Sequence, residues 1–170
     1  MSSHEMVFRP IGYVRSPYQE QSGTPIQPVF GDDTEATVEI APEYADGLCD
    51  LVGFERIWLL MWFDRARPAK MLVTPRGDTV ERGVFATRAP SRPNSIGLSC
   101  VRLLGISGAT LRIAGVDALD NTPVLDIKPY IPRIDAYRKS RAGWLDTDEV
   151  RARRGMRADE RFDQPRDTET

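Results

Sequence analysis

The chain has 170 residues, with 23 Lys and Arg against 25 Asp and Glu, one histidine and two cysteines. This length fits a single domain with a core of its own, and two cysteines are too few for a disulfide framework or a zinc site. His4 lies in a polar N-terminal stretch, which argues against histidine-based nucleophilic catalysis. Because a secretory signal pattern and a membrane-length apolar run are both missing, we expect a soluble, cytoplasmic protein. Because the chain has only one histidine and two cysteines, we also expect that it holds no metal.

The charges are segregated along the chain although the net charge is only −2. Residues 1–64 carry a net charge of −8, and residues 65–92 carry a net charge of +5. Of the 23 basic residues 20 are arginine, whose planar fork suits phosphate or carboxylate recognition. The cationic middle therefore indicates an anionic partner that the total charge hides.

Short runs with β-type patterning dominate the chain, separated by Gly and Pro. The first two predicted strands flank a loop at residues 16–34 that is too long to be idle in a small domain, and Pro42 opens a short helix. The segment 56–63 is apolar on both faces, which predicts a central strand covered on both sides. The predicted strands are residues 7–14, 35–41, 56–63, 70–74, 84–87, 98–106, 110–114 and 124–127.

A helical pattern of any length first occurs at residues 146–157, within a charge-rich segment. We expect a marginal helix there, followed by disorder. Many short strands with little helix favour an antiparallel barrel or sandwich. The predicted division is a mainly β domain over residues 1–145 and a charged tail over residues 146–170.

Residues 83–99 form the first stretch whose composition suggests a ligand site. Two X-Pro bonds impose a stiff, extended path, while Asn94 and Gly97 tolerate unusual backbone angles. Arg88 and Arg92 add fork-shaped donors. The stretch predicts a cradle for an anionic or nucleotide ligand, and the alternative is a stiff turn with solvated arginines.

Residues 116–132 form the second such stretch. Asp126 and Lys128 share one strand face among apolar neighbours, as either a structural ion pair or a proton-handling couple. Asp117 and Asp120 are either turn residues or acceptors for ribose hydroxyls. The phosphate-binding and dinucleotide-binding glycine motifs are both missing, so a nucleotide would be held by loops of a β scaffold.

These motifs resemble the TsaA-like family (also called TrmO-like or YaeB-like) of β-barrel S-adenosylmethionine-dependent methyltransferases. The resemblance runs in order and spacing over residues 7–132, through Arg15-Ser16-Pro17-Tyr18, Gln27-Pro28, Ile57-Trp58-Leu59 and the two stretches above. It implies a single-sheeted antiparallel β-barrel that forms a homodimer. It also implies methylation of the exocyclic amino nitrogen of threonylcarbamoyladenosine next to the tRNA anticodon.

Two positions and one segment depart from the family pattern. Ser95 stands where proline is usual, and Asn121 stands where glycine is usual, a change that the left-handed tolerance of asparagine makes mild. Longer members carry a second small domain, of which only residues 133–170 remain here. Two alternatives therefore stay open. The protein is either a methyltransferase of another acceptor, such as a small molecule, or a non-catalytic S-adenosylmethionine-binding module.

The resemblance, the cationic run 65–92 and the chemistry of the residues together assign residues to three roles. The expected cofactor-binding residues lie in the two motif stretches: Phe85, Arg88, Arg92, Pro93, Asn94, Ser95, Ile96, Gly97, Leu98, Asp117, Leu119, Asp120, Thr122 and Pro123. The expected tRNA-binding residues are Tyr18, Gln27, Arg65, Arg67 and Arg76. The expected catalytic residues are Asp126, Lys128 and Tyr130, with Asp126 as general base because no usable histidine is present.

Overall fold

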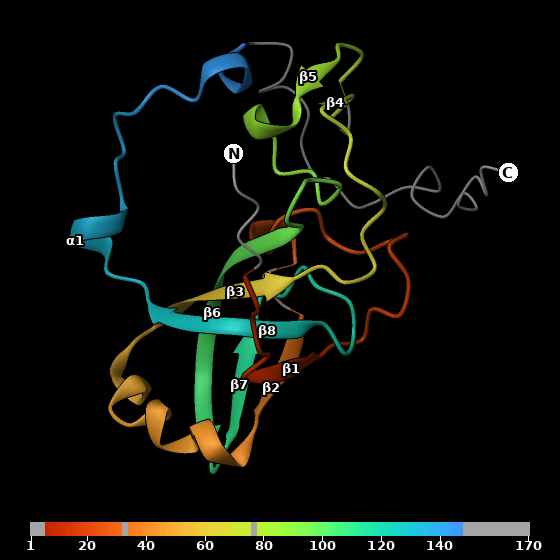
Figure 1. The fold of residues 1–170 in the computed structure, drawn as a ribbon. Helices are drawn as coiled ribbons and strands as arrows, with labels where there is room; N and C mark the ends of the chain where they lie inside the picture. Colours follow the sequence, from red (N-terminus) through yellow and green to blue (C-terminus); the bar gives the residue numbers. More distant parts are fainter. Residues whose placement is uncertain (1–5, 32–33, 76–77, 148–170) are drawn as a thin grey trace, which may run out of the picture.

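Six antiparallel strands close into a barrel in a computed structural model that describes residues 6–31, 34–75 and 78–147. Around the barrel they follow the order β1, β2, β7, β6, β3 and β8 (Figure 1). Their bounds are Gly12–Arg15 for β1, Glu35–Ile40 for β2, Arg56–Trp62 for β3, Ile96–Ser107 for β6, Thr110–Ala114 for β7 and Pro123–Pro129 for β8. The single-sheeted antiparallel barrel that the resemblance implies is confirmed.

The barrel interior is a packed apolar core, because alternate residues of each strand point inward. Strand β2 shows the alternation clearly, with Ala36, Val38 and Ile40 buried between more exposed neighbours. Fully buried aliphatic side chains fill the centre: Val14, Val38, Ile57, Leu59, Met61, Val101, Leu111, Ile113 and Val124. Side chains with chemistry to perform therefore lie at the barrel ends and on its outer face.

Strand β6 joins the two halves of the barrel. Its first part pairs with β3 and its second part with β7, and the register shifts between Leu103 and Gly105. Such an irregularity bends a strand and increases its twist. The bend lets one long strand serve both neighbours and close the sheet.

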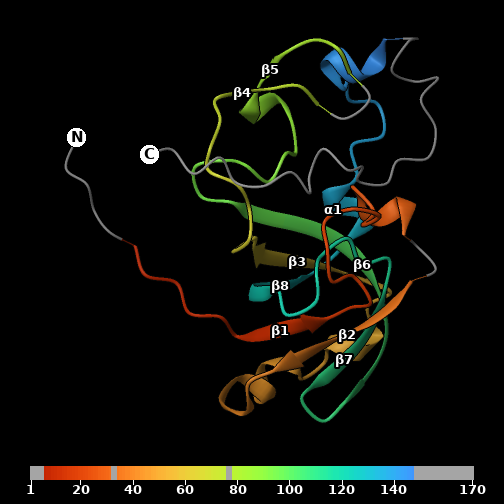
Figure 2. The same ribbon diagram turned by 90° about the vertical axis from the view of Figure 1, so that its right-hand side faces the viewer.

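The remaining elements lie at the two ends of the barrel. The short helices η2 (Pro42–Leu48) and η3 (Leu51–Gly53) join β2 to β3 at one end. The hairpin of β4 (Leu72–Val73) and β5 (Arg82–Gly83) lies at the other end in both views (Figures 1 and 2). The further elements are η1 (Pro28–Phe30), η4 (Val84–Ala86), α1 (Pro132–Asp135) and η5 (Gly143–Asp146).

Several predicted boundaries are wrong in detail. Residues 84–86 form the helical turn η4, and the strand of that region is Arg82–Gly83. The hydroxyl of Thr87 donates to the carbonyl of Val84 at 2.9 Å, which closes the chain into a turn where an extended run was expected. The first strand starts at Gly12, five residues later than predicted. The predicted helix 146–157 and the tail lie, apart from residues 146 and 147, outside the described residues.

Strand β3 is central, between β6 and β8, as predicted. The expectation that it is covered on both faces is wrong for the described part of the chain. Its inward residues are fully buried, whereas Trp58 and Leu60 are only partly buried and Trp62 is 48% exposed. The outer face of β3 is thus apolar and open. No helix among the described residues is long and apolar enough to cross a membrane.

Candidate active site

Residues 87–95 form a loop braced by one of its own arginines. Nη1 of Arg92 donates to the carbonyl oxygens of Thr87 and Ala89, both at 3.1 Å. The backbone amide of Arg92 also donates to the carbonyl of Pro90 at 2.8 Å. The guanidinium of Arg92 therefore stiffens the loop itself, whereas the sequence predicted that it contacts the ligand.

The end of this loop is fitted against Phe63. The amide of Phe63 donates to the carbonyl of Ser95 at 2.9 Å. A methyl group at Gly97 would lie 2.3 Å from Cζ of the Phe63 ring, so any larger residue there forces the ring to move. Ser95 has a φ of 44°. Proline, the usual residue here in the family that the chain resembles, has φ fixed near −65° and does not fit this conformation.

The loop of residues 116–123 is bonded to the segment that follows β1. The amide of Ser16 donates to Oδ1 of Asp120 at 3.1 Å, and its hydroxyl donates to the carbonyl of Ala118 at 2.8 Å. The amide of Asp120 in turn donates to the carbonyl of Tyr18 at 2.7 Å. Two motifs that lie about a hundred residues apart in the chain thus form one structural unit.

Arg65 holds the same loop from the other side. Its Nη2 donates to the carbonyl of Asp120 at 2.6 Å and to the hydroxyl of Thr122 at 3.2 Å. The sequence predicted that Arg65 contacts tRNA; its side chain is 39% exposed, and its Nη2 is engaged with the aspartate loop. Asn121 has a φ of 61°, which confirms that asparagine takes the backbone conformation usually left to glycine.

Each of the two loops makes a side-chain hydrogen bond to a neighbouring segment, and the charge of Arg88 acts on Asp117. The hydroxyl of Ser99 donates to Oδ1 of Asp117 at 2.5 Å, and Nη1 of Arg88 donates to Oε1 of Gln27 at 2.5 Å. Burial raises the pKa of Asp117 to about 6, against the lowering effects of Ser99 and of the positive charge of Arg88. Residues from the long loop, the arginine-rich loop, β6 and the aspartate loop therefore meet here.

This arrangement has the donors and acceptors that a nucleoside-type cofactor with amino-acid ends requires. The carboxylates of Asp117 and Asp120 can accept from hydroxyl or ammonium groups, and the exposed Arg88 can pair with a carboxylate. Apolar side chains lie on the same segments, with Phe85 75% exposed and Leu98 52% exposed. Such surfaces suit a purine ring. The residues present fit the cofactor that the resemblance implies.

The three predicted catalytic residues lie together on the outer side of the barrel. Nζ of Lys128 lies 2.8 Å from Oδ2 of Asp126, and the two side chains are 62% and 44% exposed. Tyr130 contacts Trp58 edge to face, with ring centroids 5.6 Å apart. Within the described residues no hydrogen bond links these three side chains to the loops 87–95 and 116–123.

The other predicted residues are distributed as follows. Pro93 and Asn94 are exposed at the loop tip, Ile96 is 43% exposed, Leu119 is half-buried and Pro123 is buried. The hydroxyl of Tyr18 donates to the hydroxyl of Thr34 at 3.0 Å. Arg67 is half-buried and interacts with another group of the protein, and Arg76 lies outside the described residues. Among the described residues no group of His, Cys, Asp and Glu side chains is arranged to hold a metal ion.

Sequence reasoning missed Ser16 and Ser99. Both are polar residues that bind the aspartate loop, and Ser99 is only 1% exposed. A signal for Ser99 was present, because it takes an inward position of β6 that the alternation would give to an aliphatic residue. A buried hydroxyl requires a polar partner, which is Asp117.

Comparisons with known proteins agree with this geometry. The family described as the tRNA-methyltransferase O N-terminal domain matches residues 13–136. A probable S-adenosyl-L-methionine-binding protein of Pyrococcus abyssi is 49% identical over 82% of this chain and 76% of its own length. A tRNA (adenine(37)-N6)-methyltransferase of Mus musculus is 35% identical over 80% of this chain and 33% of its own length.

A solved structure shows the same fold. The crystal structure of TrmO from Pseudomonas aeruginosa superposes with a TM-score of 0.73 and 40% sequence identity. The match covers 85% of this chain but 64% of that chain. The chain thus spans under two thirds of the TrmO structure and about a third of the mouse enzyme.

Proposed function

Because the chain belongs to the tRNA-methyltransferase O N-terminal domain family over residues 13–136, we propose that it is an S-adenosylmethionine-dependent tRNA methyltransferase. Its target is the exocyclic amino nitrogen of threonylcarbamoyladenosine next to the anticodon. The observation that carries this proposal is the electrostatic interaction between Arg88 and Asp117, which relates the two motif loops, together with the hydrogen bonds of Arg88 to Gln27 and of Ser99 to Asp117.

The cofactor is held between the loops 87–95 and 116–123. Asp117 and Asp120 accept from its hydroxyl and ammonium groups, and Arg88 pairs with its carboxylate. Phe85 supplies apolar surface for its purine ring, whereas Ile96 and Leu98, on the outer face of β6, are assigned to the subunit contact described below. Arg92 and Arg65 keep the two loops in shape through bonds to backbone carbonyls.

When bound, the cofactor supplies an electrophilic methyl group. The chain's own residues align the acceptor nitrogen with it and exclude water. The acceptor nitrogen has its lone pair drawn into a neighbouring carbonyl, so removal of its proton helps the transfer. Asp126 takes this proton as general base, and Nζ of Lys128 lies 2.8 Å from its carboxylate.

The working form is a homodimer in the cytoplasm, where tRNA substrates are found. An apolar row crosses the outer barrel face, formed by Leu60 and Trp62 on β3 with their register partners Leu98 and Ile96 on β6. Trp62 and Leu98 are about half exposed, which is unusual for a monomer surface. A second copy covers this apolar row, which lies beside Asp126, the register partner of Leu60.

Sedimentation analysis tests the dimer. Replacing Leu98 by Asp should convert the dimer to a monomer with an unchanged β-type circular dichroism spectrum. Replacing Leu104, which is exposed at the other end of β6, by Asp is the matched control and should leave the dimer intact. A wild-type protein that sediments as a monomer at micromolar concentration would reject this part of the proposal.

Transfer of a labelled methyl group tests the activity. The protein is incubated with labelled S-adenosylmethionine and tRNA from a strain that lacks the modification, and the nucleosides are identified by mass spectrometry. Label in methylated threonylcarbamoyladenosine is the expected result. Label in a different nucleoside or a small molecule would mean another acceptor, and cofactor binding without transfer would mean a non-catalytic module.

A further inference from the structure

A strap of residues 131–147 leaves the end of β8 and crosses to the β4–β5 hairpin. It passes through α1, arches away from the barrel on the left of Figure 1 and ends in η5 beside β5. The matched family region ends at residue 136, so most of the strap lies beyond it. None of the proposed cofactor-binding residues belongs to the strap, so its role has to be inferred separately.

The first end of the strap is fixed to the barrel through Asp135. Its Oδ2 accepts a hydrogen bond from the amide of Ile131 at 2.8 Å and from Nε1 of Trp58 at 3.4 Å. The amide of Tyr130, immediately before the strap, donates to the carbonyl of Arg56 at 3.0 Å. The strap therefore starts from a defined position on β3.

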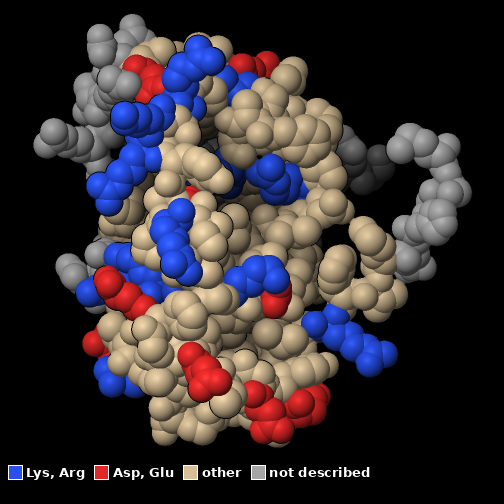
Figure 3. Space-filling model, turned by 90° about the vertical axis from the view of Figure 1, so that its left-hand side faces the viewer, with Lys and Arg blue, Asp and Glu red and all other residues tan. Residues whose placement is uncertain are grey.

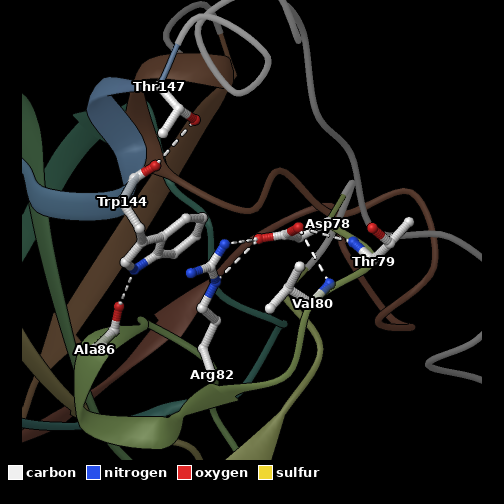
Figure 4. A network of polar contacts seen from close by, with 7 residues as sticks. All are labelled: Asp78, Thr79, Val80, Arg82, Ala86, Trp144 and Thr147. Atoms are coloured by element: carbon white, nitrogen blue, oxygen red, sulfur yellow. Dashed lines mark hydrogen bonds and ion pairs between the residues drawn. The ribbon is translucent and has the colours of Figure 1, made fainter.

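The second end is fixed by Trp144 (Figure 4). Its indole Nε1 donates to the carbonyl of Ala86 at 2.8 Å. The guanidinium of Arg82 lies 4.7 Å from the Trp144 ring centroid and forms an ion pair with Asp78 at 3.0 Å. Because Ala86 immediately precedes the loop 87–95, the strap ends against the proposed cofactor site.

Between these anchors the strap exposes cations. Arg133, Arg138, Lys139 and Arg141 are all exposed, and the one acidic residue among residues 133–141 is Asp135, which is engaged in the anchor. Tyr137 is 76% exposed and lies with Tyr130 and Arg138 along an open groove. Figure 3, which views the molecule from this side, shows cationic side chains over its upper and middle parts, with acidic ones at its lower edge and others near its top and middle.

We propose that the strap is the surface that binds the phosphate backbone of the tRNA substrate, with Arg138, Lys139 and Arg141 on phosphates and Tyr137 stacking on an unpaired base. Flexible cations beside an exposed aromatic ring are the usual means of binding single-stranded nucleic acid. Anchoring at both ends reduces the ordering cost of binding. The strap leads from β8 to the loop 87–95, so a bound strand runs toward the active site.

This inference rests on the proposed function for the identity of the RNA, but binding is measured separately from methyl transfer. The test variant is Arg138→Glu with Lys139→Glu. The matched control is Arg9→Glu with Arg112→Glu, which changes the net charge equally at two exposed arginines away from the strap. All four side chains are exposed, so both variants should fold, as circular dichroism verifies.

Fluorescence anisotropy with tRNA over a series of salt concentrations gives the readout. The strap variant should bind tRNA at least about tenfold more weakly at low salt, with its log–log salt slope reduced by about 0.7–0.9 for each phosphate that is no longer neutralised. Its KM for tRNA should rise with little change in kcat, and its affinity for S-adenosylmethionine should match the wild type. The control should bind tRNA like the wild type.

Trp144 supplies a second variant. Trp144→Ala releases the upper anchor without changing any charge and should weaken tRNA binding, whereas Trp144→Phe keeps the ring beneath Arg82 and should weaken it less. Equal tRNA binding by the strap variant and the control would overturn the inference. Strap-dependent binding without methylation of any tRNA would keep the inference and reject the proposed function. Preference for an acidic peptide over tRNA would overturn it.

Discussion

Ser99 and Asp117 form a hydrogen bond of 2.5 Å between a buried hydroxyl of the barrel wall and a carboxylate of the aspartate loop. Strand β6 carries both Ser99 and Gly97, so the bond ties the aspartate loop to the strand on which the loop 87–95 ends. The two halves of the proposed cofactor site consequently share one rigid support.

The first prediction concerns stability against pH. Burial raises the pKa of Asp117 from 3.8 to about 6, so the folded protein binds this proton more tightly than the unfolded chain does. Stability therefore falls as pH rises from about 4 to about 6, by on the order of 3 kcal/mol. Asp117→Asn should remove this dependence and be the more stable form above pH 6. Urea denaturation over the pH range measures the difference.

Cofactor affinity should respond to pH in the opposite direction. Only the ionised Asp117 accepts from a hydroxyl or ammonium group on both oxygens, so the affinity for S-adenosylmethionine should rise through about pH 6. In Asp117→Asn the calorimetric affinity should be lower and independent of pH there. The exposed variant Glu35→Gln is the control and should follow the wild type. A wild-type affinity that is flat across this range would contradict the assigned role.

The second prediction concerns Gly97. A methyl group there meets the Phe63 ring at 2.3 Å, so Gly97→Ala should cost about 1–3 kcal/mol in the free energy of unfolding. Gly105→Ala, in the same strand with open space around the added methyl group, should be close to neutral. Replacing Phe63 by Leu in the Gly97→Ala background should recover part of the loss. Additive effects of the two changes in denaturation would show that the ring is not the cause.

The sequence predicts the barrel well because periodicity and turn residues are local signals. Strand 110–114 is predicted to the residue, and strand 35–41 is one residue too long. Residues 84–87 have strand-like composition but turn on themselves, because the Thr87 side chain bonds to the carbonyl of Val84. Composition reports a preference for extended backbone, and the hydrogen bonds of the Thr87 amide and hydroxyl to Val84 override it.

The site is predicted less completely because a side chain's direction is a tertiary property. The sequence identifies Arg65, Arg88 and Arg92 as forks suited to anions, yet two of them bond to backbone carbonyls of the protein itself. Arg88 reaches Gln27 in a loop about sixty residues earlier, a pairing that spacing does not reveal. Residue type defines the chemistry available, and the fold decides which groups still face a ligand.

Arg65 provides the third prediction. Its Nη2 holds the carbonyl of Asp120 at 2.6 Å, so Arg65→Met should loosen the aspartate loop. We expect a several-fold weaker affinity for S-adenosylmethionine and a loss of about 1–3 kcal/mol in stability, because the buried Thr122 hydroxyl and the Asp120 carbonyl lose their donor. Arg112→Met, at an exposed ion pair with Glu35, should change both quantities little. If Arg65→Met weakened tRNA binding alone, direct RNA contact would be its role.

The fourth prediction separates the two candidate carboxylates. Asp126 is proposed as general base and Asp117 as a cofactor contact, so their variants should differ in kinetics. Asp126→Asn should lower kcat by about 10²–10⁴-fold with the cofactor affinity unchanged, whereas Asp117→Asn should mainly raise the KM for S-adenosylmethionine. Lys128→Met, which removes the partner at 2.8 Å but keeps the carboxylate, should lower kcat less than Asp126→Asn does.

Single-turnover rates, measured with saturating cofactor and tRNA, do not depend on the rate of product release and therefore compare the methyl-transfer step itself. Glu35→Gln, another exposed and ion-paired carboxylate on the barrel exterior, should leave kcat at the wild-type value. Wild-type turnover by Asp126→Asn would exclude Asp126 as the base. A large fall in kcat for Asp117→Asn at saturating cofactor would then move the role to Asp117, whose pKa of about 6 already suits proton transfer near neutrality.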